Sequence, residues 1–406
     1  MTAALPSGAW QQMARAAGLL DGAGTLAPTI FAEMSALATA TGAVNLGQGF
    51  PDTDGPGEVL EAAVAAIRGG RNQYPPGRGV PELRQAVAQH QRRWYDQDVD
   101  PDSQVLVTAG ATEAIAAAVL ALCSPGDEVV VLEPYYDSYA ATIALAGAVR
   151  RTVPLRFPGF RLEADALAAA VGPRTRMLLV NNPHNPSGRV LDAAELALLA
   201  ETAVRHDLVV VADEVYEHLV FDGRRHPPIA ALPGMAERTL TVSSAGKTFS
   251  VTGWKVGWVV GPAELVDAVA SVKQFLTYVN AGPLQPAVAH ALAMPDRTFA
   301  EVAGSLQRRR DQLVAGLERI GIEVSVPAGT YFVVADAAAL GADDALAFCR
   351  RLPHVAGVVA VPVQVFCDDV VAYRSLVRFA FCKRPEVLAE AVHRLESLVT
   401  GGAGAG

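Results

Sequence analysis

The sequence predicts an α/β protein with two parts: a large domain built on a mainly parallel sheet flanked by helices, and a smaller α+β domain assembled from both chain ends. The 406-residue chain exceeds the length at which one hydrophobic core usually stops growing. Between residues 105 and 261, short β-branched runs alternate with Ala/Leu-rich helical stretches. After residue 290 this alternation gives way to one long charged helix and short strands.

The alternating region contains six runs that predict strands: QVLVTAG, EVVVLEP, RMLLVNN, LVVVADE, TLTVSS and VGWVVG. Helical stretches such as TEAIAAAVLALC and AAELALLAETAVRH lie between them. In parallel sheets of this kind, ligands bind beyond the carboxyl ends of the strands. Polar residues follow five of the runs directly, so we expect five loops to converge on one pocket: residues 110–113, 133–137, 181–185, 213–216 and 243–247.

The domain boundaries follow from where this pattern starts and stops. We expect a large domain over residues 51–292 and a small C-terminal domain over residues 293–406, with the helix TFAEVAGSLQRRRDQLVAGLERIG and the strands GTYFVVAD and SLVRFAFCK. Residues 1–50 are expected to pack with the small domain, because domains assembled from both chain ends are simple to form when the termini lie close together.

Charge and composition exclude several classes of function. The net charge of −9 and the absence of a basic run with interleaved aromatics argue against a nucleic-acid partner. The four cysteines show no C-x-x-C spacing, so neither a metal site nor a disulfide framework is expected, and a reducing cytoplasm fits. The N-terminal MTAALPSGAWQQMARAAGLL lacks the pattern of a signal peptide, and no apolar region is long enough for a membrane span.

Lys247 lies in the Ser/Gly-rich segment SSAGKTFSVTGWKVGW, directly after a β run. An ammonium group held near other cations loses its proton easily, and a neutral lysine amine can form an imine. For a single lysine in a loop, an ordinary surface lysine is the competing interpretation. The neighbouring motifs decide between the two.

Two segments carry groups that suit an anionic ligand. The small residues Gly110, Ala111 and Thr112 lead into a helix, so their backbone N–H groups could approach a phosphate at the helix N-terminus. Such turns are common in α/β proteins. Arg378, in LVRFAFCK, lies on the opposite strand face from its neighbours, and its guanidinium could fork onto a carboxylate, although surface arginines are also common.

Two more segments place polar side chains at the same expected edge. Asp213 closes the run LVVVAD and Tyr216 follows three residues later, a pattern that a helix N-cap with a packed tyrosine would also explain. Asn185 lies in VNNPHNPSGRV, whose Pro and Gly residues by themselves indicate only a turn. A rigid, Pro-bounded loop is nonetheless a suitable place to fix a side-chain amide.

Taken together, these motifs resemble a known family over nearly the whole chain. In order, they are VNLGQGFPD, QYPPGRG, AGATEA, EPYYDSY, NNPHNPSG, ADEVYEHLVFD, SSAGKTFSVTGWKVGW and LVRFAFCKR. This set resembles the fold-type I, pyridoxal-phosphate-dependent class I aminotransferases, in the subgroup of kynurenine, glutamine and methionine aminotransferases and cysteine-conjugate β-lyases. Within the subgroup the chain is most similar to actinobacterial N-succinyldiaminopimelate aminotransferases, also in the strings FAEMSALAT and GPAEL.

The resemblance implies a seven-stranded sheet in the large domain and a set of cofactor contacts. Lys247 would hold pyridoxal phosphate as a Schiff base, Asp213 would face the pyridine nitrogen, and Tyr216 would lie near the ring hydroxyl. Lys255 would bind the phosphate where more distant relatives use Arg, which keeps the charge but loses the fork. The remaining cofactor contacts fall on Gly110, Ala111, Thr112, Tyr136, Asn185 and Ser244.

The resemblance also implies substrate contacts and a partner. Arg378 would bind the substrate α-carboxylate, helped by Asn185 and the backbone of Gly49. Phe31 falls where relatives place an aromatic that lines the substrate pocket, with hydrophobic packing as the alternative. Tyr74 matches a tyrosine that reaches the phosphate of the neighbouring subunit's cofactor, which implies a homodimer with shared active sites.

The implied reaction is transfer of an amino group from an amino-acid donor to a 2-oxo acid such as 2-oxoglutarate. The donor suggested by the nearest subgroup is N-succinyl-LL-diaminopimelate, in lysine biosynthesis; its distal carboxylate would need a cation, for which Arg224 and Arg225 are weak candidates. The alternatives are a methionine-, glutamine- or kynurenine-type aminotransferase and a cysteine-S-conjugate β-lyase, because β-elimination uses the same groups. A non-catalytic regulatory domain is disfavoured by the complete Lys, Asp and Arg set.

Overall fold

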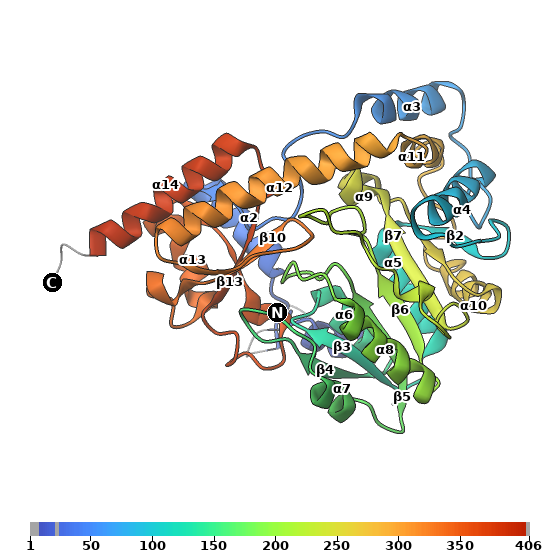
Figure 1. Ribbon diagram of the computed structural model, residues 1–406, viewed down its shortest axis with the longest axis horizontal. Helices are drawn as coiled ribbons and strands as arrows, with labels where there is room; N and C mark the ends of the chain where they lie inside the picture. The colour runs from blue at the N-terminus through green and yellow to red at the C-terminus, as the bar shows by residue number, and fades with distance from the viewer. Residues whose placement is uncertain (1–7, 21–23, 403–406) are drawn as a thin grey trace, which may run out of the picture.

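The structure is a computed structural model that describes residues 8–20 and 24–402. Its largest feature is a seven-stranded sheet with the order β2-β8-β7-β6-β5-β3-β4 (Figure 1). The strands are β2 (Val105–Thr108), β3 (Glu128–Glu133), β4 (Val149–Pro154), β5 (Thr175–Asn181), β6 (Val209–Asp213), β7 (Thr239–Ser244) and β8 (Gly257–Val260). Strand β8 runs opposite to the other six, which all share one direction. The predicted mainly parallel α/β sheet is therefore confirmed.

Helices cover both faces of this sheet because consecutive strand residues point to opposite sides. Val129 and Val131 of β3 pack with α5 (Gly110–Leu122), α6 (Asp137–Leu145) and α10 (Ala263–Lys273). Val130 and Leu132 pack on the other face with α7 (Ala164–Ala170) and α8 (Ala193–Arg205). A third apolar cluster fills the β2 end of the sheet beneath α3 (Gly57–Arg68), α4 (Pro81–Tyr95) and α11 (Gln285–Leu292).

One strand has no counterpart among the six predicted runs. Strand β4 is an edge strand that pairs only with β3. Its sequence, VRRTVP, carries two arginines, and Arg150 and Arg151 pair with Asp368 and Glu128. An edge strand has less surface to bury, so it lacks the continuous apolar pattern that marked the central strands.

The second part of the molecule holds a four-stranded antiparallel sheet with the order β12-β13-β10-β9. Its strands are β9 (Glu323–Ser325), β10 (Phe332–Asp336), β12 (Val361–Pro362) and β13 (Leu376–Ala380). The helices of this part are α2 (Ile30–Thr41), α12 (Asp296–Arg319), α13 (Ala345–Val355) and α14 (Pro385–Gly402), and α12 extends in Figure 1 from α14 at the left across to α11. The predicted long charged helix and the two predicted strands are present as α12, β10 and β13.

The N-terminal segment joins this second part through a short parallel pair, β1 (Val44–Asn45) with β11 (Val358–Val359). Helix α1 (Ala9–Ala16) lies instead against α6 beside the large sheet. The boundaries near residues 50 and 292 stay a prediction. The remaining short elements are α9 (Ala245–Thr248), η1 (Ile229–Ala231), η2 (Thr252–Trp254), η3 (Ala337–Leu340) and η4 (Val363–Phe366).

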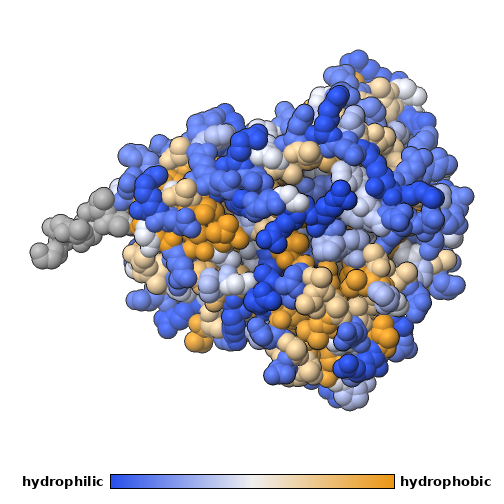
Figure 2. Space-filling view, viewed as in Figure 1, coloured by the Kyte–Doolittle hydropathy of each residue, from blue (hydrophilic) through white to orange (hydrophobic). Residues whose placement is uncertain are grey.

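Hydrophilic side chains cover most of the face seen in Figure 2, with apolar residues in patches between them. Within residues 8–20 and 24–402, no helix combines the length and the apolar character needed to cross a bilayer.

Candidate active site

A cavity of about 310 Å³ lies at the carboxyl edge of the large sheet. Strands β2, β3, β5, β6 and β7 all point their carboxyl ends to this edge, so the loops after them meet there. Strand β8 runs the other way, which brings the residues before it to the same place. All five predicted loops contribute to the lining, which includes Phe31, Gly49, Gly110, Ala111, Thr112, Tyr136, Asn185, Asp213, Tyr216, Ser244, Lys247, Lys255 and Arg378.

Lys247 lies in the one-turn helix α9, directly after β7. Its Nζ donates a hydrogen bond to the Tyr331 hydroxyl at 3.0 Å. Desolvation in the cavity lowers the pKa of Lys247 to about 8, with Arg378 and Lys255 contributing repulsion, although Cys382 and Asp213 oppose the shift. The amine is therefore far more readily deprotonated than that of a surface lysine.

Asp213 is the last residue of β6 and is buried. It accepts hydrogen bonds from the Tyr139 hydroxyl and from the Val215 N–H, the latter at 3.3 Å. Burial raises the pKa of Asp213 to about 6, and these hydrogen bonds and Lys247 limit the rise. Tyr216, also buried, has its pKa raised by desolvation and so keeps its phenolic proton.

The end of the cavity nearest α5 is built to hold an anion. Lys255 donates from Nζ to the Thr112 hydroxyl at 3.3 Å, beside the first turn of α5. Gly110 has a φ of 73°, and a Cβ on it would lie 3.3 Å from the Lys255 amine. Glycine thus admits both this backbone conformation and the close approach of the cation. A helix N-terminus and an ammonium group together form a site for phosphate.

Arg378, on β13, supplies a second cation at the opposite side of the cavity. Nη1 donates to the Asn185 amide oxygen at 3.0 Å and Nη2 donates to the Gly47 carbonyl at 3.2 Å, so both partners are neutral. Among the described residues, the buried Nε has no hydrogen-bond partner. Desolvation lowers the pKa of Arg378 to about 10. A buried guanidinium with neutral partners is prepared to bind a carboxylate ligand.

Aromatic rings surround this guanidinium. Its Cζ lies 3.9 Å from the Phe332 ring centroid and 5.5 Å from that of Phe31. Burial raises the pKa of the Tyr136 phenol, which also lines the cavity, to about 12. The rings exclude water and hold the guanidinium in one plane.

Three of the sequence candidates lie elsewhere. Tyr74 is 81% exposed and contacts the ring of Tyr278, with centroids 5.7 Å apart. In this single chain it is therefore outside the cavity. Arg224 and Arg225 are exposed in the loop after Phe221, and the cavity lining does not include them.

The structure adds three residues that sequence reasoning had not assigned to the site. Tyr139 donates to Asp213, Tyr331 bonds to Lys247, and Phe332 packs on Arg378. Tyr139 was recognisable in part, because it follows the candidate Tyr136 by three residues, one helical turn along EPYYDSY. Tyr331 and Phe332 gave only a strand pattern, and their proximity to the site depends on how the two sheets pack.

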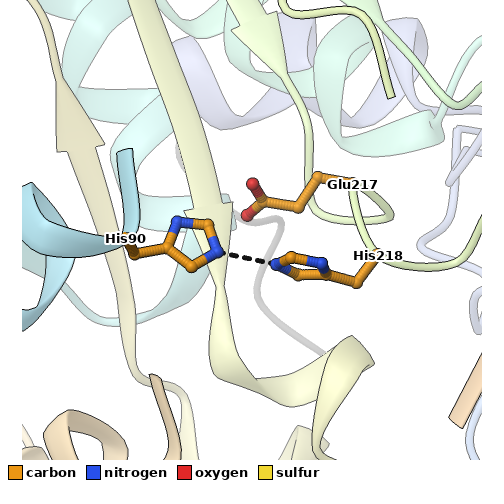
Figure 3. A group of neighbouring side chains, drawn as sticks. All are labelled: His90, Glu217 and His218. Atoms are coloured by element: carbon orange, nitrogen blue, oxygen red, sulfur yellow. Dashed lines mark hydrogen bonds between the residues drawn. The ribbon is translucent and has the colours of Figure 1, made fainter. Parts of the chain in front are cut away.

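A buried cluster outside the cavity lining consists of His90, Glu217 and His218 (Figure 3). The two Nε2 atoms lie 2.6 Å apart, a hydrogen-bond distance. Two imidazole nitrogens on one tetrahedral zinc ion would lie roughly 3.3 Å apart, given Zn–N bonds of about 2.0–2.1 Å. Tyr95 and Ser243 also donate to the two Glu217 oxygens. The geometry is that of a hydrogen-bonded network, and the expectation of no metal stays a prediction.

Comparison with known proteins identifies the family. A family model described as aminotransferase class I and II matches residues 41–395. A probable N-succinyldiaminopimelate aminotransferase of Mycobacterium tuberculosis is 57% identical over 92% of this chain and 96% of its own, and a methionine aminotransferase of Escherichia coli is 41% identical over the same shares. A solved structure of N-succinyldiaminopimelate aminotransferase from M. tuberculosis superposes with a TM-score of 0.90 at 58% identity, covering 92% of this chain and 97% of the other. The chain belongs to the class I and II aminotransferases and is an aminotransferase.

Proposed function

We propose that the chain is a pyridoxal-phosphate-dependent aminotransferase that moves an amino group between an amino acid and a 2-oxo acid. The observation that carries this proposal is the arrangement of charge in one cavity. A lysine with its pKa lowered to about 8, a buried carboxylate, an ammonium at a helix N-terminus and a buried guanidinium whose hydrogen-bond partners are neutral all line it.

The residues present fit pyridoxal phosphate. The phosphate would be held by Lys255, Thr112, Ser244 and the first turn of α5. Because residue 110 is glycine, no side chain at that position fills the space beside the Lys255 amine. Asp213 would hold a proton on the ring nitrogen. Tyr216 and Asn185 would bind the ring oxygen, Tyr136 would cover the ring face, and Lys247 would bond to the aldehyde carbon. When bound, the cofactor supplies an electron sink for the substrate Cα.

Each protein group then has a defined task. Lys247, once free, takes the substrate Cα proton on its amine and later returns a proton, as general base and acid. Its pKa near 8 suits both roles near neutral pH. Arg378 and Asn185 bind the α-carboxylate and so fix the Cα–H bond toward Lys247. The rings of Phe31 and Phe332 exclude water from this region.

We propose N-succinyl-LL-diaminopimelate as the donor, in lysine biosynthesis, with 2-oxoglutarate as the acceptor. The support for this donor is the name of the M. tuberculosis relatives. The cavity itself favours a second candidate, because Phe31, Phe50 and Phe332 present apolar surface and suit a methionine-type donor. The basic residues of the lining, Lys247, Lys255 and Arg378, already have roles. A distal carboxylate of the substrate would therefore need a cation from outside this cavity lining.

Single-turnover measurements test both proposals. Holoenzyme is mixed, in the absence of an acceptor, with one donor at a time, and the absorbance of the bound cofactor is followed. The donors are N-succinyl-LL-diaminopimelate, methionine, glutamine, kynurenine and a cysteine S-conjugate. We expect the succinylated donor to react fastest, and Lys247→Ala to react with none. Reaction with methionine alone would reject the succinylated donor. Release of pyruvate and ammonia from the conjugate without an acceptor would instead favour β-elimination.

We also propose that the enzyme acts as a homodimer with shared active sites in the cytoplasm. The support is a patch of exposed apolar side chains next to the phosphate end of the cavity: Tyr74, Phe275, Leu276 and Tyr278. Asn280 connects this segment to the cavity, since its amide donates to the Lys255 carbonyl at 3.0 Å. Sedimentation of the holoenzyme tests the dimer, and fractionation of cells tests the location.

A further inference from the structure

The Tyr331 hydroxyl lies between the reactive lysine and the segment that reaches the substrate. Tyr331 immediately precedes β10 and is only 1% exposed. Its oxygen accepts the 3.0 Å hydrogen bond from Lys247 Nζ, and its O–H donates to the Gly49 carbonyl. Tyr331 comes 84 positions after Lys247 in the sequence, so only the packing of the two sheets brings them together.

The direction of these two hydrogen bonds follows from counting protons. A phenol has one proton to donate, and here the Gly49 carbonyl, which can only accept, receives it. Burial raises the pKa of Tyr331 well above its usual value, so the phenol keeps this proton. Its oxygen can therefore only accept from Lys247. A neutral amine that donates one N–H in this way keeps its lone pair pointing away from the tyrosine.

The tyrosine is rigidly held. Its ring packs edge-on against Tyr216 and Phe332, with centroid distances of 5.4 and 4.7 Å. A Cβ at position 49 would lie 3.1 Å from Tyr331 Cε2 and 2.4 Å from Phe332 Cζ, so the backbone of Gly49 is pressed against these rings. The hydroxyl therefore has little freedom to move with the lysine.

The lysine, in contrast, borders a second cavity. Lys247 and Tyr331 both line a second cavity, of about 520 Å³, together with residues of α12 such as Arg297 and Glu301. Lys247 lines the first cavity as well. A flexible four-carbon stem beside two cavities has more than one rotamer open to it unless its amine is tethered.

We propose that Tyr331 is a positioning residue that fixes the Lys247 amine with its lone pair toward the cofactor carbonyl and, later, the substrate Cα. This inference rests on the proposed function. In the attachment step the amine nitrogen bonds to the aldehyde carbon of pyridoxal phosphate, and the aldehyde oxygen leaves as water with the two amine protons. A lone pair already aimed at that carbon shortens the search for the reactive geometry.

The test compares cofactor attachment in Tyr331→Phe and the unmodified chain, both stripped of cofactor. The rate at which pyridoxal phosphate becomes trapped on Lys247 by borohydride is measured, alongside the affinity for pyridoxamine phosphate, which cannot bond to the lysine. Phenylalanine retains the packed ring. We expect the trapping rate to fall about tenfold, the value of one hydrogen bond, while the affinity for pyridoxamine phosphate stays within about twofold.

Lys383→Met is the matched control, because Lys383 Nζ donates to the Phe50 carbonyl, one residue from Gly49. It loosens the same segment without touching the lysine amine, and we expect a trapping rate close to that of the unmodified chain. An unchanged rate in Tyr331→Phe, an equal loss of pyridoxamine phosphate affinity, or an equal fall in Lys383→Met would each overturn the inference. If the unmodified chain were not labelled at Lys247, the proposed function would fail, and the inference with it.

Discussion

At the scale of single residues, the lowered pKa of Lys247 predicts how its reactivity depends on pH. The neutral amine is the nucleophile, and its fraction rises with pH around a pKa of about 8, where half of the amine is neutral. We therefore expect the rate of borohydride-trapped attachment of pyridoxal phosphate to be half-maximal near pH 8 and to level off about one pH unit higher. A rate that continues to rise up to the pKa of an exposed lysine would contradict the lowered pKa of Lys247. Lys247→Ala measures the background labelling of other amines.

Arg378 allows a second prediction at this scale. Arg378→Lys keeps the positive charge but replaces the planar guanidinium by a compact ammonium group. That group cannot bond to Asn185 and bind a substrate carboxylate at two oxygens at the same time. We expect kcat/KM for the amino donor to fall by about tenfold or more, the loss of at least one charge-assisted hydrogen bond. The affinity for pyridoxamine phosphate, which has no carboxylate, should remain close to that of the unmodified chain. A parallel loss of both would assign Arg378 a structural role.

At the scale of elements, the start of α5 depends on a contact with the start of β8. A Cβ on Gly257 would lie 2.6 Å from the carbonyl carbon of Gly110, so Gly257→Ala must displace the turn that carries the proposed phosphate site. We expect weaker binding of pyridoxal phosphate, measured by fluorescence titration, and a lower melting temperature. Gly253→Ala, where a Cβ would meet open space, is the control and should change neither.

The strands of the large sheet differ in how well the sequence predicts them. The central strands were predictable because burial on both faces gives continuous apolar runs. Strand β4 was not, because an edge strand tolerates the arginines of VRRTVP. The five loops were predictable as a group because parallel strands end at one edge. The antiparallel entry of β8, which delivers Lys255 to that edge, required the strand order of the folded sheet.

At the scale of the whole molecule, the proposed shared site predicts complementation between two inactive variants. Lys247→Ala removes the lysine and Tyr74→Ala removes the residue proposed to reach the neighbouring cofactor. In a mixed dimer one site would lose both groups and the other would keep both. When equal amounts of the two variants mix at random, half of the dimers contain one chain of each kind, and each mixed dimer has one intact site. Mixing therefore restores about a quarter of the activity at limiting cofactor. No restoration would mean that Tyr74 does not act across an interface.

The sequence by itself determined the family, six of the seven strands of the large sheet and most of the polar groups that line the cavity. Lys247, Asp213, Asn185 and Arg378 each lie in a short segment whose turn residues and apolar neighbours are local. Local patterns of this kind depend only on the strand period, on turn chemistry and on spacing, which can be read from the sequence without the fold.

Only the tertiary structure decided the electrostatics and the supporting contacts. The pKa values of Lys247 and Asp213 are set mainly by desolvation, which depends on what packs around each group. The neutral partners of Arg378 and the hydroxyl of Tyr331 come from segments far away in the sequence. Burial and long-range contacts are properties of the whole packed chain, so the sequence could name the candidate lysine but not the tyrosine that hydrogen-bonds to it.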